Sequence, residues 1–175
     1  MNRLTAKEFK RAVKFPAVIV LDNVRSAYNV GSVFRTADAF RIESLHLCGI
    51  SARPPHKDIY KTALGATESV QWNYFDKVEN SLTLLKQDGY EIFAVEQADP
   101  SIKLSDFHIG PDIKIALVFG HEVKGVSDRA LSFAKACIEI PQYGTKHSLN
   151  ISVSVGIVLW EIIRDRIQNS KLPPE

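Results

Sequence analysis

The stretch Lys114-Ile-Ala-Leu-Val-Phe-Gly-His-Glu-Val-Lys-Gly-Val-Ser127 decides the fold class of this chain. Its first part, Lys114–Phe119, is apolar after the lysine, which is typical of a strand buried on both faces of a sheet. Ser127 stands where a helix N-cap is expected, and the residues after it continue with helical spacing at Ala130, Leu131 and Ala134. A buried strand, a glycine-bounded turn and a helix in direct succession indicate an α/β protein.

The same alternation of short β-rich runs and helical segments extends along the whole chain. Each expected strand is rich in β-branched or aromatic residues and is bounded by turn residues. Strands that alternate with helices predict a mostly parallel sheet covered by helices on both faces. We expect strands at Ala17–Leu21, Ser44–Cys48, Val70–Tyr74, Tyr90–Val95, Lys114–Phe119 and Cys137–Ile140, with helices that carry Val30–Ala37 and Leu82–Leu85 between them.

Two further helices are expected near the ends of the sequence. Thr5-Ala-Lys-Glu8 is a capping-box pattern, which predicts a short basic helix over about residues 5–14. Ile151–Val155 alternates like a strand, but Gly156–Gln168 suits a helix, so we expect one long helix over about 149–169. The first helix would present one cationic face, formed by Lys7, Lys10, Arg11 and Lys14. This face is either a solvated surface or a contact for nucleic-acid phosphates.

The composition is that of an ordinary globular protein. With 175 residues, 45% of them hydrophobic, and no linker or repeat, the chain is expected to form a single domain over residues 1–175. Cys48 and Cys137 stand apart from each other and from any histidine at ligand spacing, so we expect no disulfide, no metal site and a cytoplasmic location. No apolar stretch approaches the ~20 residues of a membrane span, so no membrane partner is expected.

Ligands of open α/β sheets bind beyond the carboxyl ends of the strands, and three polar segments follow expected strands there, over 22–31, 120–127 and 141–150. The chain contains no Gly-x-Gly, which argues against an ordinary dinucleotide or Rossmann methyltransferase site. Gly120 and Gly125 have P-loop spacing, but Val126 stands where the phosphate-binding lysine is required. His147 beside Ser148 lacks the elbow motif of a serine hydrolase.

Together, these three segments closely resemble the three motifs of the SpoU/TrmH family of RNA ribose 2′-O-methyltransferases, a branch of the SPOUT superfamily. Two positions depart from the family pattern: His121 replaces a common asparagine, and Gln142 replaces an apolar residue. The match spans nearly the whole chain. The matching stretches, in family order, are Val20–Phe40, Leu117–Ser127 and Ile140–Ser154, and Lys61–Ala66 is similar to the tRNA-type branch.

The resemblance implies a SPOUT fold with a C-terminal trefoil knot, a homodimer, and S-adenosylmethionine as cofactor. The implied activity is methyl transfer to a ribose 2′-hydroxyl of RNA. We expect tRNA to be favoured over rRNA, because of the tRNA-type features together with the expected absence of a separate N-terminal RNA-binding domain. Family positions place five residues around the cofactor, namely Val95, Gly120, Ile140, Ser148 and Leu149. They place four at the reacting centre, namely Asn29, Arg35, Glu122 and Asn150.

The chemistry of these side chains limits their roles. A guanidinium has no proton-accepting atom, so we expect Arg35 to grip an RNA phosphate or the hydroxyl rather than act as a base. Glu122 has two open roles: it orients Arg35 across a dimer interface, or it accepts backbone N–H bonds and holds the motif loops. The alternative function is a catalytically silent RNA-binding relative, against which the intact motif residues argue.

Overall fold

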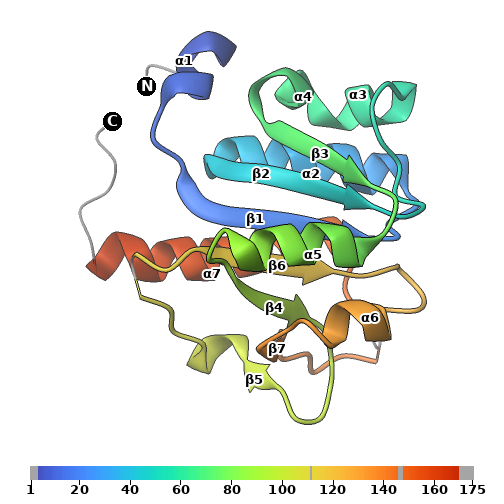
Figure 1. The fold of residues 1–175 in the computed structure, drawn as a ribbon, viewed down its shortest axis with the longest axis vertical. Coiled ribbons are helices and arrows are strands. Elements are labelled where there is room, and N and C mark those ends of the chain that lie inside the picture. Colours follow the sequence, from blue (N-terminus) through green and yellow to red (C-terminus); the bar gives the residue numbers. More distant parts are fainter. Residues whose placement is uncertain (1–3, 111, 146–147, 170–175) are drawn as a thin grey trace.

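The structure, a computed structural model, describes residues 4–110, 112–145 and 148–169 (Figure 1). Within these ranges, the centre of the protein is a seven-stranded parallel sheet with the strand order β3-β2-β1-β6-β4-β7-β5. All six expected strands are present, with ends shifted by at most two residues. The strands are β1 (Phe15–Asp22), β2 (Ile42–Cys48), β3 (Gln71–Phe75), β4 (Glu91–Val95), β5 (Ile102–Lys103), β6 (Ile115–Phe119) and β7 (Ala136–Glu139).

The helices include two that the sequence did not predict, α3 and α4, while the expected α6 ends before Ala134. Only two residues of α3 are buried, Ile59 and Ala63, so its apolar pattern is too short to stand out. The edge strand β5, which is exposed, was also missed. The helices are α1 (Ala6–Arg11), α2 (Ala27–Ala39), α3 (Lys57–Ala63), α4 (Ala66–Ser69), α5 (Val78–Gln87), α6 (Asp128–Leu131) and α7 (Ile151–Asn169).

The sheet is covered on both faces, as predicted. Along β1, Ile19 and Leu21 point into one buried cluster, which also takes residues from α2, α3 and α7. Val18 and Val20 point into a second cluster, which takes residues from α5 and α6. Successive strand residues face opposite sides, so a central strand that is apolar throughout supplies both layers of the core.

Helix α7 resolves the conflict in the sequence between strand and helix at Ile151–Val155. Ile151 and Val155 are buried four residues apart, whereas Val153 between them is 48% exposed. This is helical spacing on one face, and it continues through Val158 and Leu159. The buried face of α7 packs against α2 in the first cluster.

Helix α2 lies close against α3 because Gly31 has no side chain. A Cβ at this position would come within 2.1 Å of Thr62 Oγ1 and 2.4 Å of the Ile59 carbonyl oxygen. Thr62 Oγ1 also donates a hydrogen bond of 3.0 Å to the Tyr28 carbonyl oxygen in the first turn of α2. The close approach therefore fixes the start of α2, which carries one of the expected site residues.

Helix α1 ends at Arg11, earlier than the sequence indicated, because Ala12 already has extended backbone. Lys7, Lys10 and Arg11 are exposed on this helix. Lys14 differs, since its ammonium lies 3.3 Å from the centroid of the Phe9 ring and donates to the Phe9 carbonyl oxygen. The expectation that Lys14 shares the cationic face is therefore wrong. Helix α1 precedes β1, so it lies at the amino ends of the strands (Figure 1).

One histidine is part of the core. His46 on β2 is 4% exposed, and its Nδ1 lies 2.7 Å from Ser81 Oγ on α5. Burial lowers the pKa of His46 to about 4. Among the described residues, no three His, Cys, Asp or Glu side chains are grouped so that they could hold a metal ion. None of the helices in the same ranges is both long and apolar enough to cross a membrane.

Candidate active site

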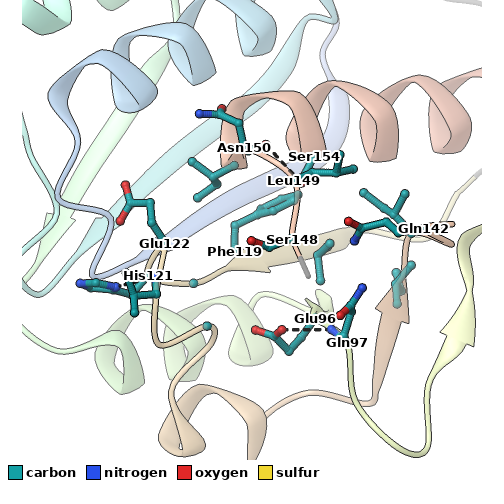
Figure 2. Close-up of a pocket in the computed structure, with 17 residues that line it drawn as sticks. Glu96, Gln97, Phe119, His121, Glu122, Gln142, Ser148, Leu149, Asn150 and Ser154 are labelled. Carbon is teal, nitrogen blue, oxygen red and sulfur yellow. Dashed lines mark hydrogen bonds between the residues drawn. The ribbon is translucent and has the colours of Figure 1, made fainter. Parts of the chain in front are cut away.

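A cavity of about 480 Å³ opens at the carboxyl ends of β4, β6 and β7 (Figure 2). Its walls come from the end of β4, the turn after β6, and the segment that leads from β7 into α7. This is the edge at which open α/β sheets bind ligands, and the volume falls within the range of small-molecule sites.

The structure brings together the five residues that the sequence assigned to the cofactor. All of them line this cavity, although they come from four separate stretches of the chain. Three of these residues supply apolar wall, and the other two supply a bare backbone and a hydroxyl. They are Val95, Gly120, Ile140, Ser148 and Leu149. Their contact with a cofactor remains a prediction.

Gly120 allows two parts of the chain to pass each other at the cavity wall. A Cβ on Gly120 would come within 2.1 Å of the Gly125 carbonyl carbon and of the Val126 backbone nitrogen. Both of these are backbone atoms, which cannot swing aside as a flexible side chain could. No residue with a side chain fits at position 120 without moving the turn that follows.

The turn from His121 to Gly125 is closed by its own hydrogen bonds. The backbone nitrogen of each of these two residues donates to the carbonyl oxygen of the other, at 2.9 and 2.8 Å. His121 Nδ1 also accepts from the Val123 backbone nitrogen at 3.0 Å. The ring nitrogen accepts a hydrogen bond from the backbone two residues later, as the side-chain oxygen of an asparagine can. Histidine can therefore stand at this position in place of the family's common asparagine.

Glu96 is a site residue that the sequence analysis missed. It follows β4 directly and lines the cavity (Figure 2). Its Oε2 accepts from the Val126 backbone nitrogen at 2.9 Å, and its Oε1 accepts from the Gln97 backbone nitrogen at 3.0 Å. Glu96 therefore holds the turn after β6 against the end of β4. The rule that polar residues follow strands at a ligand edge would have found it, had it been applied to β4.

Three of the four residues expected at the reacting centre form one hydrogen-bonded chain. Asn29 Nδ2 donates to Glu122 Oε1 at 3.4 Å, and Asn150 Nδ2 donates to Asn29 Oδ1 at 3.1 Å. Glu122 Oε1 also accepts from the Ser26 backbone nitrogen at 3.3 Å. Glu122 and Asn150 line the cavity as well, so the chain of side chains lies on its rim.

Asn150 has a second task at the start of α7. Its Oδ1 accepts from the Ser152 backbone nitrogen at 2.9 Å and from the Ser152 hydroxyl at 2.6 Å. This is the N-cap interaction, which satisfies a backbone donor that the first helical turn leaves open. The helix start thus fixes the orientation of the Asn150 amide, whose nitrogen faces Asn29.

Arg35 does not join this chain of contacts. It lies six residues after Asn29 on α2, which turns its side chain by about 120° and moves it about 9 Å along the helix axis. It is exposed, is not among the cavity residues, and makes no hydrogen bond or ion pair with the residues that the structure describes. The structure therefore brings together three of the four expected residues and leaves Arg35 outside the cavity of its own chain.

Fold and site together place a cavity of small-molecule size at the carboxyl edge of an α/β sheet, with two amide groups and a carboxylate on its rim. Comparison with known families makes this specific. Residues 16–160 match the model of the SpoU rRNA Methylase family. The chain belongs to that family.

Curated relatives include enzymes that act on two kinds of RNA. The chain is 31% identical over 154 residues to the tRNA (guanosine(18)-2'-O)-methyltransferase of Aquifex aeolicus, a match that covers 85% of this chain and 69% of the relative. It is 28% identical over 158 residues to the 23S rRNA (guanosine-2'-O-)-methyltransferase RlmB of Neisseria meningitidis, which covers 90% of this chain and 62% of that protein. The chain thus spans about two thirds of the length of these relatives.

Solved structures show the same fold. The crystal structure of the A. aeolicus TrmH/SpoU tRNA modifying enzyme superposes with a TM-score of 0.80 at 27% identity, covering 94% of this chain and 81% of the other. The AdoMet-bound rRNA methyltransferase of Sinorhizobium meliloti superposes with a TM-score of 0.78 at 25% identity, covering 88% of this chain and 61% of the other.

Proposed function

We propose that the protein transfers a methyl group from S-adenosylmethionine to a ribose 2′-hydroxyl of RNA, with tRNA favoured over rRNA. The observation that carries the proposal is the cavity whose rim holds Asn29, Glu122 and Asn150 in one hydrogen-bonded chain. Family membership supports the reaction type. The tRNA preference is supported by relatives named tRNA (guanosine(18)-2'-O)-methyltransferase.

The cavity fits S-adenosylmethionine in size and in chemistry. Its volume of about 480 Å³ suits a ligand with a nucleoside and an amino-acid arm. Val95, Ile140 and Leu149 offer apolar wall to an adenine ring, and the bare backbone at Gly120 permits a close approach. The Ser148 hydroxyl offers a hydrogen bond to a polar group. When bound, the cofactor supplies a methyl group activated on a positively charged sulfur.

The chain's own residues then have to position a hydroxyl and dispose of its proton. Asn29 and Asn150 carry amide groups on the rim, where they can hydrogen-bond the ribose hydroxyl or the cofactor carboxylate and hold it in line. Arg35 grips an RNA phosphate or the hydroxyl through its planar donors. Because guanidinium cannot accept a proton, the acceptor is a phosphate oxygen or water.

Glu122 holds the motif loops together in this proposal. Its carboxylate accepts from the Ser26 backbone and the Asn29 amide, which join the segment after β1 to the turn after β6. These contacts support the second of the two roles considered for it. Glu122 is therefore a positioning residue that orients Asn29.

The protein acts as a homodimer, with α7 in the interface. Val153, Ile157 and Trp160 are spaced by four and three residues on α7 and are 48%, 37% and 56% exposed. Such a stripe of apolar side chains is typical of a surface that another chain covers. A second copy would also bring its Arg35 to a cavity that the first copy's Arg35 does not reach. Trp160→Glu is expected to yield monomers in sedimentation and to abolish turnover.

The SPOUT trefoil knot and a cytoplasmic location complete the proposal. The knot is supported by the resemblance of Leu117–Ser127 and Ile140–Ser154 to the family motifs. The cytoplasmic location is supported by bacterial relatives named for tRNA and rRNA substrates.

The deciding experiment is methylation of total RNA with radiolabelled S-adenosylmethionine, followed by size separation and nuclease mapping. Label in the tRNA fraction, in an alkali-resistant dinucleotide, is the expected result, because 2′-O-methylation blocks alkaline cleavage at that ribose. Calorimetry with S-adenosylmethionine and S-adenosylhomocysteine accompanies it. A folded sample that binds neither compound would contradict the enzyme proposal, and one that binds RNA alone would be the silent relative.

A further inference from the structure

We propose that an exposed surface at the carboxyl ends of β1, β2 and β3 stacks unpaired RNA nucleotides that flank the methylated one. This stacking surface comprises Arg25, Tyr28, Arg53, Lys61 and Tyr74. It lies on the loops at the ends of these strands and on α2 and α3 (Figure 1). None of its residues lines the cavity described above. The inference rests on the proposed function, because it states how the RNA substrate is held beside the same site.

Its first part is a guanidinium stacked on a phenol ring. Arg53 Cζ lies 3.7 Å from the centroid of the Tyr74 ring, and the Tyr74 hydroxyl donates to the Gly49 carbonyl oxygen at 3.0 Å. Both side chains are exposed. The ring is thus fixed at both ends and carries a flat cation on its face. A guanidinium plane is a surface on which an unpaired base stacks, while its N–H edges reach phosphate oxygens.

A second cation and ring lie next to the reacting centre. Lys61 Nζ is 5.8 Å from the centroid of the Tyr28 ring, which is 51% exposed. Tyr28 immediately precedes Asn29 on α2, and its carbonyl oxygen is held by Thr62 on α3. The backbone at Tyr28 and Asn29 is therefore held in place by the same contact with α3.

The two parts are joined through the backbone. The Ala52 nitrogen donates to the Val24 carbonyl oxygen at 3.0 Å, and the Val24 nitrogen donates to Ser51 Oγ at 2.8 Å. Arg25 directly follows Val24 and Arg53 directly follows Ala52, so the two arginines are adjacent to the hydrogen bonds that join these loops. From there the chain continues to Ser26, whose nitrogen donates to Glu122. The stacking surface is continuous with the rim of the cavity.

The charges on the stacking surface favour RNA as the occupant. Arg25 and Arg53 are exposed and form no ion pair within the described ranges, while Lys61 is paired with Asp58 at 3.0 Å. Two guanidinium groups without an ion pair, one of them stacked on an exposed ring, stand out in a chain whose net charge is only +2. Single-stranded nucleic acid supplies what this combination binds, namely phosphates and bases with exposed faces.

Methyl transfer requires that the RNA strand be held in position, and the stacking surface can do this. A ribose hydroxyl must lie within bonding reach of the methyl group, and a misplacement of about 1 Å costs roughly 100-fold in rate. Amide groups on the rim can orient one ribose but cannot hold a flexible strand. Stacking of the neighbouring bases on Arg53–Tyr74 and on Tyr28 would fix the strand on the approach to the cavity.

The test compares tRNA binding by single variants of the full chain. The probe is end-labelled, unfractionated tRNA in a filter-binding assay, with S-adenosylmethionine affinity measured on the same samples as the check of fold. Arg53→Ala and Tyr74→Ala are expected to raise the Kd for tRNA by about 10-fold or more. Both variants should keep the wild-type affinity for S-adenosylmethionine within about two-fold, because neither residue lines the cavity.

Two conservative variants separate stacking from charge. Tyr74→Phe keeps the ring and is expected to bind tRNA within about two-fold of wild type. Arg53→Lys keeps the charge but loses the plane, so its Kd should rise several-fold. Arg129→Ala is the matched control, since Arg129 pairs with Glu79 on the other face of the sheet and should have no effect.

The outcomes distinguish this inference from the proposed function. Wild-type affinity in Arg53→Ala and Tyr74→Ala, with RNA methylation intact, would overturn the stacking surface alone and leave a protein partner as its occupant. Full affinity in Arg53→Lys would also overturn it, because charge alone would then suffice. A wild-type protein that neither binds nor methylates tRNA would remove the proposed function, and the stacking surface with it.

Discussion

Asn150 Nδ2 donates a hydrogen bond of 3.1 Å to Asn29 Oδ1, across a separation of 121 residues in the sequence. The same Asn150 side chain caps α7 through its oxygen, and the same Asn29 side chain donates to Glu122. The Asn150 amide therefore bonds the helix start with its oxygen and Asn29 with its nitrogen, and the Asn29 amide bonds Asn150 with its oxygen and Glu122 with its nitrogen. This arrangement fixes the direction of both amides without any ligand, which is what a site needs if it is to orient a hydroxyl at once.

The two tasks of Asn150 can be separated by substitution. Asn150→Ala is expected to lower stability by about 1 kcal/mol through loss of the cap, and to lower kcat by about 100-fold through loss of the Asn29 contact. Asn150→Asp keeps the capping oxygen but loses the donor, so it should keep the wild-type melting temperature and lose the activity. Thermal unfolding and turnover of both variants check this. Equal activity in Asn150→Asp and wild type would show that the Asn29 contact is dispensable.

Arg35→Ala is expected to abolish turnover while fold and S-adenosylmethionine affinity stay unchanged, because the side chain is proposed to act on RNA and forms no hydrogen bond or ion pair with a described residue. Arg35→Lys should restore little activity, since an ammonium lacks the planar fork. Steady-state kinetics and calorimetry test both variants. A kcat above about a tenth of the wild-type value, a barrier change of less than ~1.4 kcal/mol, would make Arg35 an ordinary surface residue.

Gly120→Ala is expected to weaken S-adenosylmethionine binding by at least about 10-fold, because the new methyl group would displace the turn from Gly125 to Val126. Gly110→Ala is the control, since a Cβ there meets nothing closer than 3.4 Å. Calorimetry on both variants measures the difference. Undiminished affinity in Gly120→Ala would mean that the turn is free to move and does not shape the cavity.

Stability should fall as the solution is acidified through the range set by His46. Its pKa is about 4 in the folded protein and 6.5 in the unfolded chain, so the unfolded state takes up a proton first. The contribution of neutral His46 is complete above pH 6.5 and is lost as the pH falls towards 4, to a total of about 3 kcal/mol. Denaturant unfolding at several pH values measures the slope. His46→Asn should flatten it, whereas the same change at the exposed His56 should not.

The cations of α1 are expected to contribute phosphate contacts. Replacing Lys7, Lys10 and Arg11 by glutamine should weaken RNA binding at any sequence and flatten the dependence of log K on log salt by up to about 0.7 to 0.9 per lost contact. Lys14→Gln is the matched control, because the Lys14 ammonium lies on the Phe9 ring and donates to the Phe9 carbonyl oxygen. An unchanged salt slope in the triple variant would mark this face as solvated surface.

The position of α1 sets a minimum length for an RNA that contacts both this helix and the cavity. The helix lies at the amino ends of the strands, and the cavity lies at their carboxyl ends. The eight residues of β1 span ~26 Å between these edges. An RNA that contacts both regions of one protein molecule must be at least that long, which a folded tRNA satisfies and a mononucleotide or dinucleotide does not.

The sheet was predictable because its signal is local. Central strands such as Lys114–Phe119 are recognised by apolar residues on both faces, and the exposed edge strand β3 by its aromatic residues; all six expected strands are present in the structure. Helix α3 was not predictable, because only two of its residues, Ile59 and Ala63, belong to an apolar face. Strand β5 was not predictable either, because both of its residues are exposed. Short elements owe their form to neighbours that are distant in sequence.

The site was predictable in its members but not in its contacts. The resemblance named Asn29, Glu122 and Asn150, but nothing in the sequence shows that Asn29 lies between the other two. Glu96 follows an expected strand and could have been found from that position, but its contact with the Val126 nitrogen forms only in the folded turn. The separation of Arg35 from the cavity likewise follows from helix geometry, since six residues on α2 turn the side chain away.

The order in which the cavity's residues occur has a consequence for biosynthesis. Every residue that lines the cavity lies at position 95 or later, and the latest is Ser154 in the first turns of α7. Translation delivers the amino-terminal part of a chain first, so Asn29 and the loops of the stacking surface leave the ribosome before any cavity wall exists. A nascent or prematurely terminated chain that stops before Asn150 therefore lacks part of the cavity wall, so methyl transfer has to wait until synthesis has passed the first turns of α7.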